Sequence, residues 1–178
     1  MPRQIALLRG INLGARKRVA MGELRDLLES LGYEDVQTYL QSGNVVLTSE
    51  QPEERLAREV GRQVAAKLGV ESKIVVRSRD ELAEVVARNP LDDVANDPKR
   101  YQVSFLSAEP DPERVRRLEA LDVAPERFVA SGREIYAWHP GGMQRSRLAA
   151  ALTDERLGVT ATARNWSTVC KLLALADG

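Results

Sequence analysis

Arg164, Asn165 and Trp166 stand directly before an apolar run that predicts a C-terminal helix. Asn165 is a good N-cap, because its side-chain oxygen can accept a hydrogen bond from a backbone N–H one turn further on. Arg164, Thr168 and Lys171 are spaced by four and three residues, which predicts that they line one side of the helix start. Cations beside the positive dipole end of a helix are typical of an anion-binding site. The same residues also fit a capped helix that Trp166 docks on the core, and the sequence leaves both interpretations open.

Two further segments combine glycine with basic residues. The Arg9–Arg18 segment holds four cations in ten residues, with Asn12 between its glycines. The His139–Arg147 segment is a Gly-Gly loop that leads into a short predicted helix, which Ser146 can cap beside Arg145. Both segments fit an anion site, and both also fit ordinary solvated loops. Neither is a P-loop, since GxxxxGK followed by Ser or Thr is absent.

Most catalytic chemistries find no support in the side chains. His139 is the only histidine and Cys170 the only cysteine, so a zinc site of Cys and His ligands within one chain is not expected. A serine or cysteine nucleophile needs a positioned base. His139 is expected to be a surface or structural residue and not such a base. Cys170 falls on the apolar face of the predicted C-terminal helix, as a core thiol does. With no carboxylate pair and no acidic Mg²⁺ motif, the sequence names no reaction, metal or cofactor.

The composition is that of a globular protein with a core. The chain has 178 residues, 43% of them hydrophobic and 29% charged, and its 26 basic residues balance 26 acidic ones. No bulk field therefore draws it to nucleic acid or to a membrane. No apolar run is long enough to span a bilayer, and MPRQIALLRGIN does not fit a signal peptide. Together with the single cysteine, these features favour a cytoplasmic location.

Hydrophobic periodicity predicts the order strand, helix, strand, strand, helix, strand for the first half. Ser42-Gly43 joins two β-rich segments and indicates a hairpin. This order is the split arrangement of a ferredoxin-like unit. The predicted segments are strands Ile5–Ile11, Val36–Gln41, Asn44–Thr48 and Lys73–Arg77, with helices Met21–Leu31 and Glu53–Leu68.

The second half is predicted to vary the same plan. Its hairpin turns at Ser131-Gly132, so YLQSGNVVL and FVASGREIY suggest a divergent duplication, although a chance match of a common turn dipeptide stays open. The expected fold is α+β, with two ferredoxin-like subdomains at residues 1–78 and 79–178, the second ending in the C-terminal helix. The predicted segments are helices Asp80–Ala87, Pro112–Leu121 and Leu148–Leu152, with strands Tyr101–Leu106, Arg127–Ala130 and Glu134–Trp138.

Five ordered blocks resemble the bacterial domain-of-unknown-function family numbered 1697. They are LLRGIN, Met21 with Leu24, TYLQSGNVV, HPGGMQRSRL and TATARNWSTVCKLLAL. The resemblance runs from about Ile5 to Leu175 and implies a two-part α+β fold built on ferredoxin-like units, but no activity. Ala15 departs from the family pattern where a second glycine is usual, and Arg147 where Lys is expected, which matters at a bidentate site. The matching residues are Arg9, Gly10, Asn12, Tyr39, Gln41, Ser42, Gly43, Asn44, Ser146, Arg164, Asn165, Trp166, Thr168 and Lys171.

The favoured hypothesis is that the protein binds a small phosphorylated or carboxylated ligand between its two halves, where ligand sites often form. The first and third strands of a ferredoxin-like half are expected to run parallel, which would place the Gly10–Arg18 loop and the Ser42-Gly43 turn at opposite ends of the sheet. Alternation puts Tyr39 and Gln41 on one strand face, which Arg9 can share. The candidate ligand-binding residues are Arg9, Asn12, Tyr39, Gln41, Asn44, Arg145, Ser146, Arg164, Asn165, Thr168 and Lys171.

Two alternatives stay open. One is a nucleic-acid-binding module, although RNA-recognition modules stack bases on strand aromatics. Aromatic residues make up 4% of this chain, and its first strand, IALLRGI, has none. The other alternative is a ligand-free interaction scaffold, for example a homodimer. The sequence predicts no membrane partner and leaves the oligomeric state open.

Overall fold

The computed structural model describes residues 2–178, which form eight strands and seven helices in two compact units. Unit 1 contains the chain up to Ala83 together with Lys171–Gly178, and unit 2 contains Glu84–Cys170. Two helices are divided between the units, α3 (Arg79–Arg88) and α7 (Trp166–Asp177). The sequence placed the whole C-terminal helix in the second half, whereas the last part of α7 belongs to unit 1.

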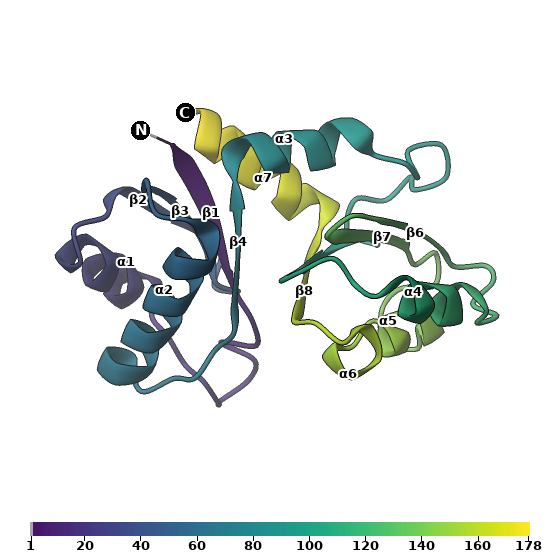
Figure 1. The fold of residues 1–178 in the computed structure, drawn as a ribbon, viewed down its shortest axis with the longest axis horizontal. Coiled ribbons are helices and arrows are strands. Elements are labelled where there is room, and N and C mark those ends of the chain that lie inside the picture. The colour runs from purple at the N-terminus through teal and green to yellow at the C-terminus, as the bar shows by residue number, and fades with distance from the viewer. Residues whose placement is uncertain (1) are drawn as a thin grey trace. The chain divides into compact units, whose positions relative to one another are not determined.

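Unit 1 contains β1 (Arg3–Leu8), α1 (Met21–Ser30), β2 (Glu34–Tyr39), β3 (Asn44–Thr48), α2 (Glu53–Leu68) and β4 (Ile74–Ser78). Its strands lie in the order β2-β3-β1-β4, and α1 and α2 cover one face of this sheet (Figure 1). Leu56, Val60 and Val64 recur every fourth residue along α2 and are fully buried against the sheet. The predicted order of elements in the first half is therefore confirmed.

Unit 2 contains β5 (Tyr101–Leu106), α4 (Pro112–Glu119), β6 (Arg127–Ser131), β7 (Glu134–Trp138), α5 (Arg147–Ala151), α6 (Asp154–Leu157) and β8 (Ala161–Asn165). The strand order β6-β7-β5-β8 repeats that of unit 1. Leu118, Ala151 and Leu157 bring one residue each from α4, α5 and α6 into a core that includes Ile135 of the sheet. β8 and α6 were not predicted from the sequence. The predicted α+β class is confirmed, with two antiparallel sheets.

A buried arginine occupies the same register position in both sheets. Arg77 of β4 lies opposite Ile5 of β1, and Arg164 of β8 lies opposite Val103 of β5. Both arginines are buried, with exposed fractions of 1% and 8%. Charged side chains are seldom buried this deeply, so their recurrence at one register position supports the duplication.

The residue after each buried arginine caps the next helix. Ser78 Oγ accepts a hydrogen bond from the backbone N–H of Glu81 at 3.1 Å, at the start of α3. Asn165 Oδ1 accepts from the backbone N–H of Thr168 at 2.9 Å, at the start of α7. The cap predicted at Asn165 is therefore present, and unit 1 has its counterpart.

Strand direction corrects one expectation about unit 1. β1 pairs antiparallel with β3, so that Leu7 lies opposite Asn44 and Arg3 opposite Thr48. The end of β1 therefore meets the start of β3, and the Gly10–Arg18 loop lies at the same end of the sheet as the Ser42-Gly43 turn. The expectation of opposite ends was wrong, because the crossover through α1 makes β1 parallel to β2, with β3 between them.

Both predicted hairpins are present, but their turns differ. In unit 1 four residues, Leu40–Gly43, join β2 to β3, whereas in unit 2 only Gly132 and Arg133 join β6 to β7. Gly132 has a φ of +58°, which suits the first position of a type II′ turn. Ser131 still belongs to β6, so the two Ser-Gly dipeptides are not equivalent. The repeat lies in the sheet register and not in the turn sequence.

Candidate functional site

Asn12 folds the loop between β1 and α1 back on itself. Its backbone N–H donates to the carbonyl oxygen of Lys17 at 2.9 Å. Its side chain donates to the carbonyl oxygen of Val19 at 2.9 Å and accepts from the Val19 N–H at 2.8 Å. Asn12 has a φ of +54°, which asparagine tolerates better than most residues do. The loop is therefore held closed by one side chain.

The same side chain joins this loop to the hairpin turn of unit 1. Asn12 Nδ2 donates to the carbonyl oxygen of Gln41 at 2.7 Å, and the N–H of Leu8 donates to the carbonyl oxygen of Gly43 at 2.8 Å. Gly43 has a φ of +88°, and a Cβ there would lie 2.7 Å from Leu8 Cβ. Because only glycine permits this approach, Gly43 fixes the turn against the end of β1.

The loop between β1 and α1 is basic. The segment Arg9–Ala20 contains no Asp or Glu, and Arg16–Arg18 are exposed. Arg9 is half-buried, and its backbone N–H donates to the carbonyl oxygen of exposed Lys73 at 2.9 Å. Five cations therefore belong to this end of the sheet and its adjoining loop, which favours the approach of an anion.

The backbone of the loop supplies donors as well. The φ angle is positive at Gly10, Asn12 and Gly14, and it is not positive at Ile11 and Leu13 between them. Alternation of this kind builds the backbone nests that bind anions through successive N–H groups. Within residues 2–178, no hydrogen bond uses the N–H of Gly10 or of Ile11. Two consecutive donors thus follow Arg9.

The other predicted residues of unit 1 lie close by with different roles. Tyr39 ends β2 and is half-buried, whereas Gln41 is exposed and lies beyond the strand. The predicted shared strand face was therefore wrong, because Leu40 between them turns the chain with a φ of +58°. Asn44 is fully buried, and its amide donates to the carbonyl oxygen of Tyr39 at 2.9 Å and to Ser42 Oγ at 2.8 Å. Asn44 holds the turn in shape.

Arg164 lies in β8 and not on a helix. Its guanidinium donates to Thr162 Oγ1 at 2.8 Å and to the carbonyl oxygen of Ala163 at 2.9 Å. Burial lowers its pKa to about 10, so the group stays charged at neutral pH. Arg9 belongs to unit 1 and Arg164 to unit 2, and a ligand shared by both stays a prediction.

The rest of the C-terminal cluster divides into capping and packing residues. The helix begins at Trp166, after the Asn165 cap. Arg164 therefore precedes the helix, and the predicted helical spacing of Arg164, Thr168 and Lys171 was wrong. Trp166 stacks on Tyr101 with ring centroids 4.8 Å apart. Thr168 is buried, and Lys171 is exposed. The interpretation of a capped helix docked by Trp166 thus describes the contacts made by this cluster.

Unit 2 holds a buried polar cluster around His139. Its Nδ1 lies 2.6 Å from Glu126 Oε2 and 2.9 Å from Ser146 Oγ, and Ser146 Oγ also donates to Glu126. Ser146 caps α5 by accepting from the N–H of Ala149 at 2.8 Å, while Glu126 accepts from the N–H of Leu148 at 3.1 Å. Burial raises the pKa of Glu126, but the hydrogen bonds from Ser146, His139 and Leu148 outweigh it and hold that pKa below its ordinary value.

The cluster does not have the geometry of a hydrolytic triad. In a triad the serine and the carboxylate occupy opposite nitrogens of the imidazole, whereas Ser146 and Glu126 both lie at Nδ1 of His139. His139 is 1% exposed, and its buried Nε2 has no hydrogen-bond partner among residues 2–178. Arg145 is exposed beside the cluster. Glu126, which sequence reasoning did not single out, anchors α5.

The two central strands of unit 2 offer no exposed aromatic platform. Tyr101, Phe105, Tyr136 and Trp138 lie on the two central strands of unit 2 and are at most 8% exposed. Bases cannot stack on rings that are buried in this way. Burial also raises the pKa of the Cys170 thiol, which makes it a poor nucleophile. Among residues 2–178, no helix is both long enough and apolar enough to cross a bilayer.

Known proteins match the chain in its fold and in its family. No curated protein matches it. The solved structure of a conserved bacterial protein from Streptococcus pneumoniae is similar, with a TM-score of 0.76, 24% sequence identity and 98% of each chain covered, which shows the shared fold. The family model described as "Protein of unknown function (DUF1697)" matches residues 1–136, a stretch that includes the Gly10–Arg18 loop and both hairpin turns. The chain belongs to this family.

Proposed function

We propose that the protein binds a small phosphorylated or carboxylated ligand at the end of the unit 1 sheet. The site is formed by the Gly10–Arg18 loop and the Leu40–Gly43 turn. The observation that carries the proposal is the 2.7 Å hydrogen bond from Asn12 Nδ2 to the carbonyl oxygen of Gln41, which joins the basic loop to the turn. This bond ties the side chain of the loop directly to the backbone of the turn.

The chemistry of the site matches an anion in two ways. Arg9 and Arg16–Arg18 supply charge, while the N–H groups of Gly10 and Ile11 supply neutral donors. Hydrogen bonds to charged groups contribute about 1.5–3 kcal/mol each. Because the side chain of Asn12 already closes the loop, little conformational entropy remains to be lost when a ligand binds.

We further infer that both units are ferredoxin-like. The strand orders β2-β3-β1-β4 and β6-β7-β5-β8, antiparallel throughout, support this assignment. In unit 1 each crossover helix then connects two parallel strands that are separated by one antiparallel neighbour, which is the split βαβ arrangement.

The experiment uses inorganic pyrophosphate and citrate as probes of the two ligand classes, with affinity measured by calorimetry. Arg16→Gln/Lys17→Gln removes two exposed cations from the loop. Arg116→Gln/Arg117→Gln is the matched control, because it removes two exposed cations that pair with Glu113 on α4. We expect the loop variant to bind at least about tenfold more weakly and the control to stay close to the parent.

Three outcomes contradict the proposal. If both variants bind like the parent, the anion lies elsewhere. If neither probe binds the parent, the interaction-scaffold interpretation is favoured. If only single-stranded oligothymidylate binds, and its affinity falls steeply with salt, the nucleic-acid interpretation is favoured instead.

A further inference from the structure

The two units differ in how regularly one edge strand pairs with its neighbour. In unit 1 the edge strand β2 shifts register between Glu34 and Gln37, and Asp35 has a φ of +51°. Irregularities and charges of this kind keep an edge from pairing with other chains. In unit 2 the edge strand β6 pairs with β7 in unbroken register from Arg127 to Ser131. The edge in unit 2 therefore lacks the irregularity present in unit 1.

Backbone donors of β6 face outward. Ser131 lies opposite Glu134 and closes the two-residue turn. In an antiparallel pair, residues alternate between directing their N–H and C=O groups to the partner strand and directing them away from it. Counting back from Ser131, Ala130 and Phe128 direct these groups away from β7. Both residues are only partly buried.

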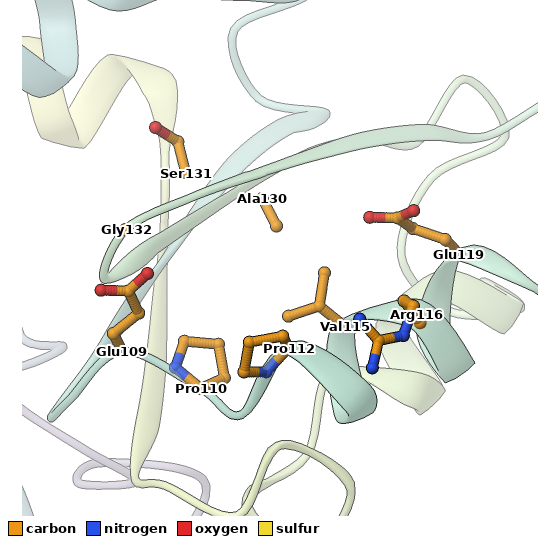
Figure 2. Close-up of a pocket in the computed structure, with 9 residues that line it drawn as sticks. All are labelled: Glu109, Pro110, Pro112, Val115, Arg116, Glu119, Ala130, Ser131 and Gly132. Carbon is orange, nitrogen blue, oxygen red and sulfur yellow. The ribbon is translucent and has the colours of Figure 1, made fainter.

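A pocket of about 290 Å³ lies beside this edge, between α4 and the β6–β7 hairpin (Figure 2). Its apolar lining comes from Pro110, Pro112 and Val115 on one side and from Ala130 on the other. A groove between an edge strand and a helix is the setting in which extended peptides add to a sheet. The pocket has room for one apolar side chain of such a peptide.

The ends of the pocket are acidic. Glu109 and Glu119 stand at opposite ends in Figure 2, and neither forms an ion pair within residues 2–178. Arg116 also lines the pocket, but its guanidinium lies 2.6 Å from Glu113 Oε2. A ligand with basic groups on either side of an apolar group therefore matches the charges of the pocket.

We propose that β6 accepts an extended peptide segment of a partner protein as a fifth strand. One apolar side chain of the peptide enters the pocket, and basic side chains two residues before and after it face Glu109 and Glu119. Alternation along a strand puts these three side chains on one face. This interaction is independent of the anion site in unit 1.

The test uses a fluorescent peptide, acetyl-Lys-Thr-Val-Thr-Lys-amide, with binding followed by anisotropy. We expect the same peptide with Glu in place of both Lys residues to bind much more weakly. A peptide N-methylated at Val and at the second Thr loses at least one N–H that faces β6 in either strand direction, and it should also bind more weakly. In the protein, Glu109→Gln/Glu119→Gln should weaken binding about fivefold, whereas Glu23→Gln/Glu29→Gln, an equal loss of charge on α1, should not.

Peptide binding that is unaffected by the N-methyl groups would overturn strand addition. Binding that the Glu109→Gln/Glu119→Gln variant leaves unchanged would overturn the charge assignment. Sedimentation supplies a further test, because we expect the free protein to have an unpaired β6 edge. A dimer whose slow amide exchange includes Phe128 and Ala130 would show that a second copy of the chain occupies the edge and not a partner peptide.

Discussion

The two units differ more in the segment that follows the first strand of each sheet than in the sheets themselves. In unit 1 the Arg9–Ala20 segment forms a closed basic loop, whereas in unit 2 the short Ser107–Asp111 segment leads straight into α4. The N–H of Ser107 donates a hydrogen bond at 2.9 Å to the carbonyl oxygen of Thr160, the residue that precedes β8. The shared sheet therefore supplies the frame, and the longer loop supplies the proposed anion site of unit 1.

The largest predicted effect comes from the two hairpin glycines. Gly43→Ala should destabilise the protein by roughly 3 kcal/mol, because the positive φ and a Cβ only 2.7 Å from Leu8 Cβ act together. Gly132→Ala has the positive φ but nothing within 4 Å of the added Cβ, so it should cost roughly 1–2 kcal/mol. Urea unfolding of both variants checks the difference, and equal losses would show that the turn of unit 1 is not pressed against β1.

The second prediction uses the buried cluster of unit 2. The pKa of Glu126 is held below its ordinary value of 4.5, so the carboxylate stabilises the fold above that pH and loses its contribution as the pH falls through the lowered value. Glu126→Gln should cost about 2 kcal/mol at pH 7. It should also flatten the loss of stability below about pH 4.5. Thermal unfolding across this range checks the prediction, and parallel curves for parent and variant would refute it.

The smallest predicted effects come from the equivalent helix caps. Ser78→Ala and Asn165→Ala each remove one side-chain cap and should each cost about 1 kcal/mol. Similar losses in urea unfolding would show that the two caps, which follow the buried arginines of the two sheets, have equivalent roles. A loss at only one of them would show that the repeated geometry no longer has the same role in both units.

Most helices and strands could be predicted from the sequence, because their apolar side chains recur with helical or strand periodicity. Three strands, Asn44–Thr48, Tyr101–Leu106 and Glu134–Trp138, have the bounds that apolar and β-branched patterning predicts, and so does the helix Glu53–Leu68. β8 was missed because alanine and threonine alternate along it and give little contrast between faces. α6 was missed because its four residues are too few to show a helical period.

The residues of the proposed site were easier to predict than their proximity in the folded protein. Arg9, Asn12 and Gln41 stood out by type, but only the direction of β3 shows that they share one end of the sheet. Glu126 gave no signal, because it is 13 residues from His139 and 20 from Ser146 along the chain. Contacts between segments so far apart in sequence depend on the packing of the fold.

A titration of the isotope-labelled protein with inorganic pyrophosphate, followed through its backbone amide resonances, tests directly whether the basic loop and the hairpin turn of unit 1 bind one anion. We expect the amides of Gly10–Arg18 and Leu40–Gly43 to shift together with one dissociation constant. In Asn12→Gly, which keeps the left-handed backbone but loses the side-chain bonds to Val19 and Gln41, the shifts of the two segments should weaken and separate. Shifts confined to Arg145–Arg147, or no shifts at all, would show that the Gly10–Arg18 loop and the Leu40–Gly43 turn do not form an anion site.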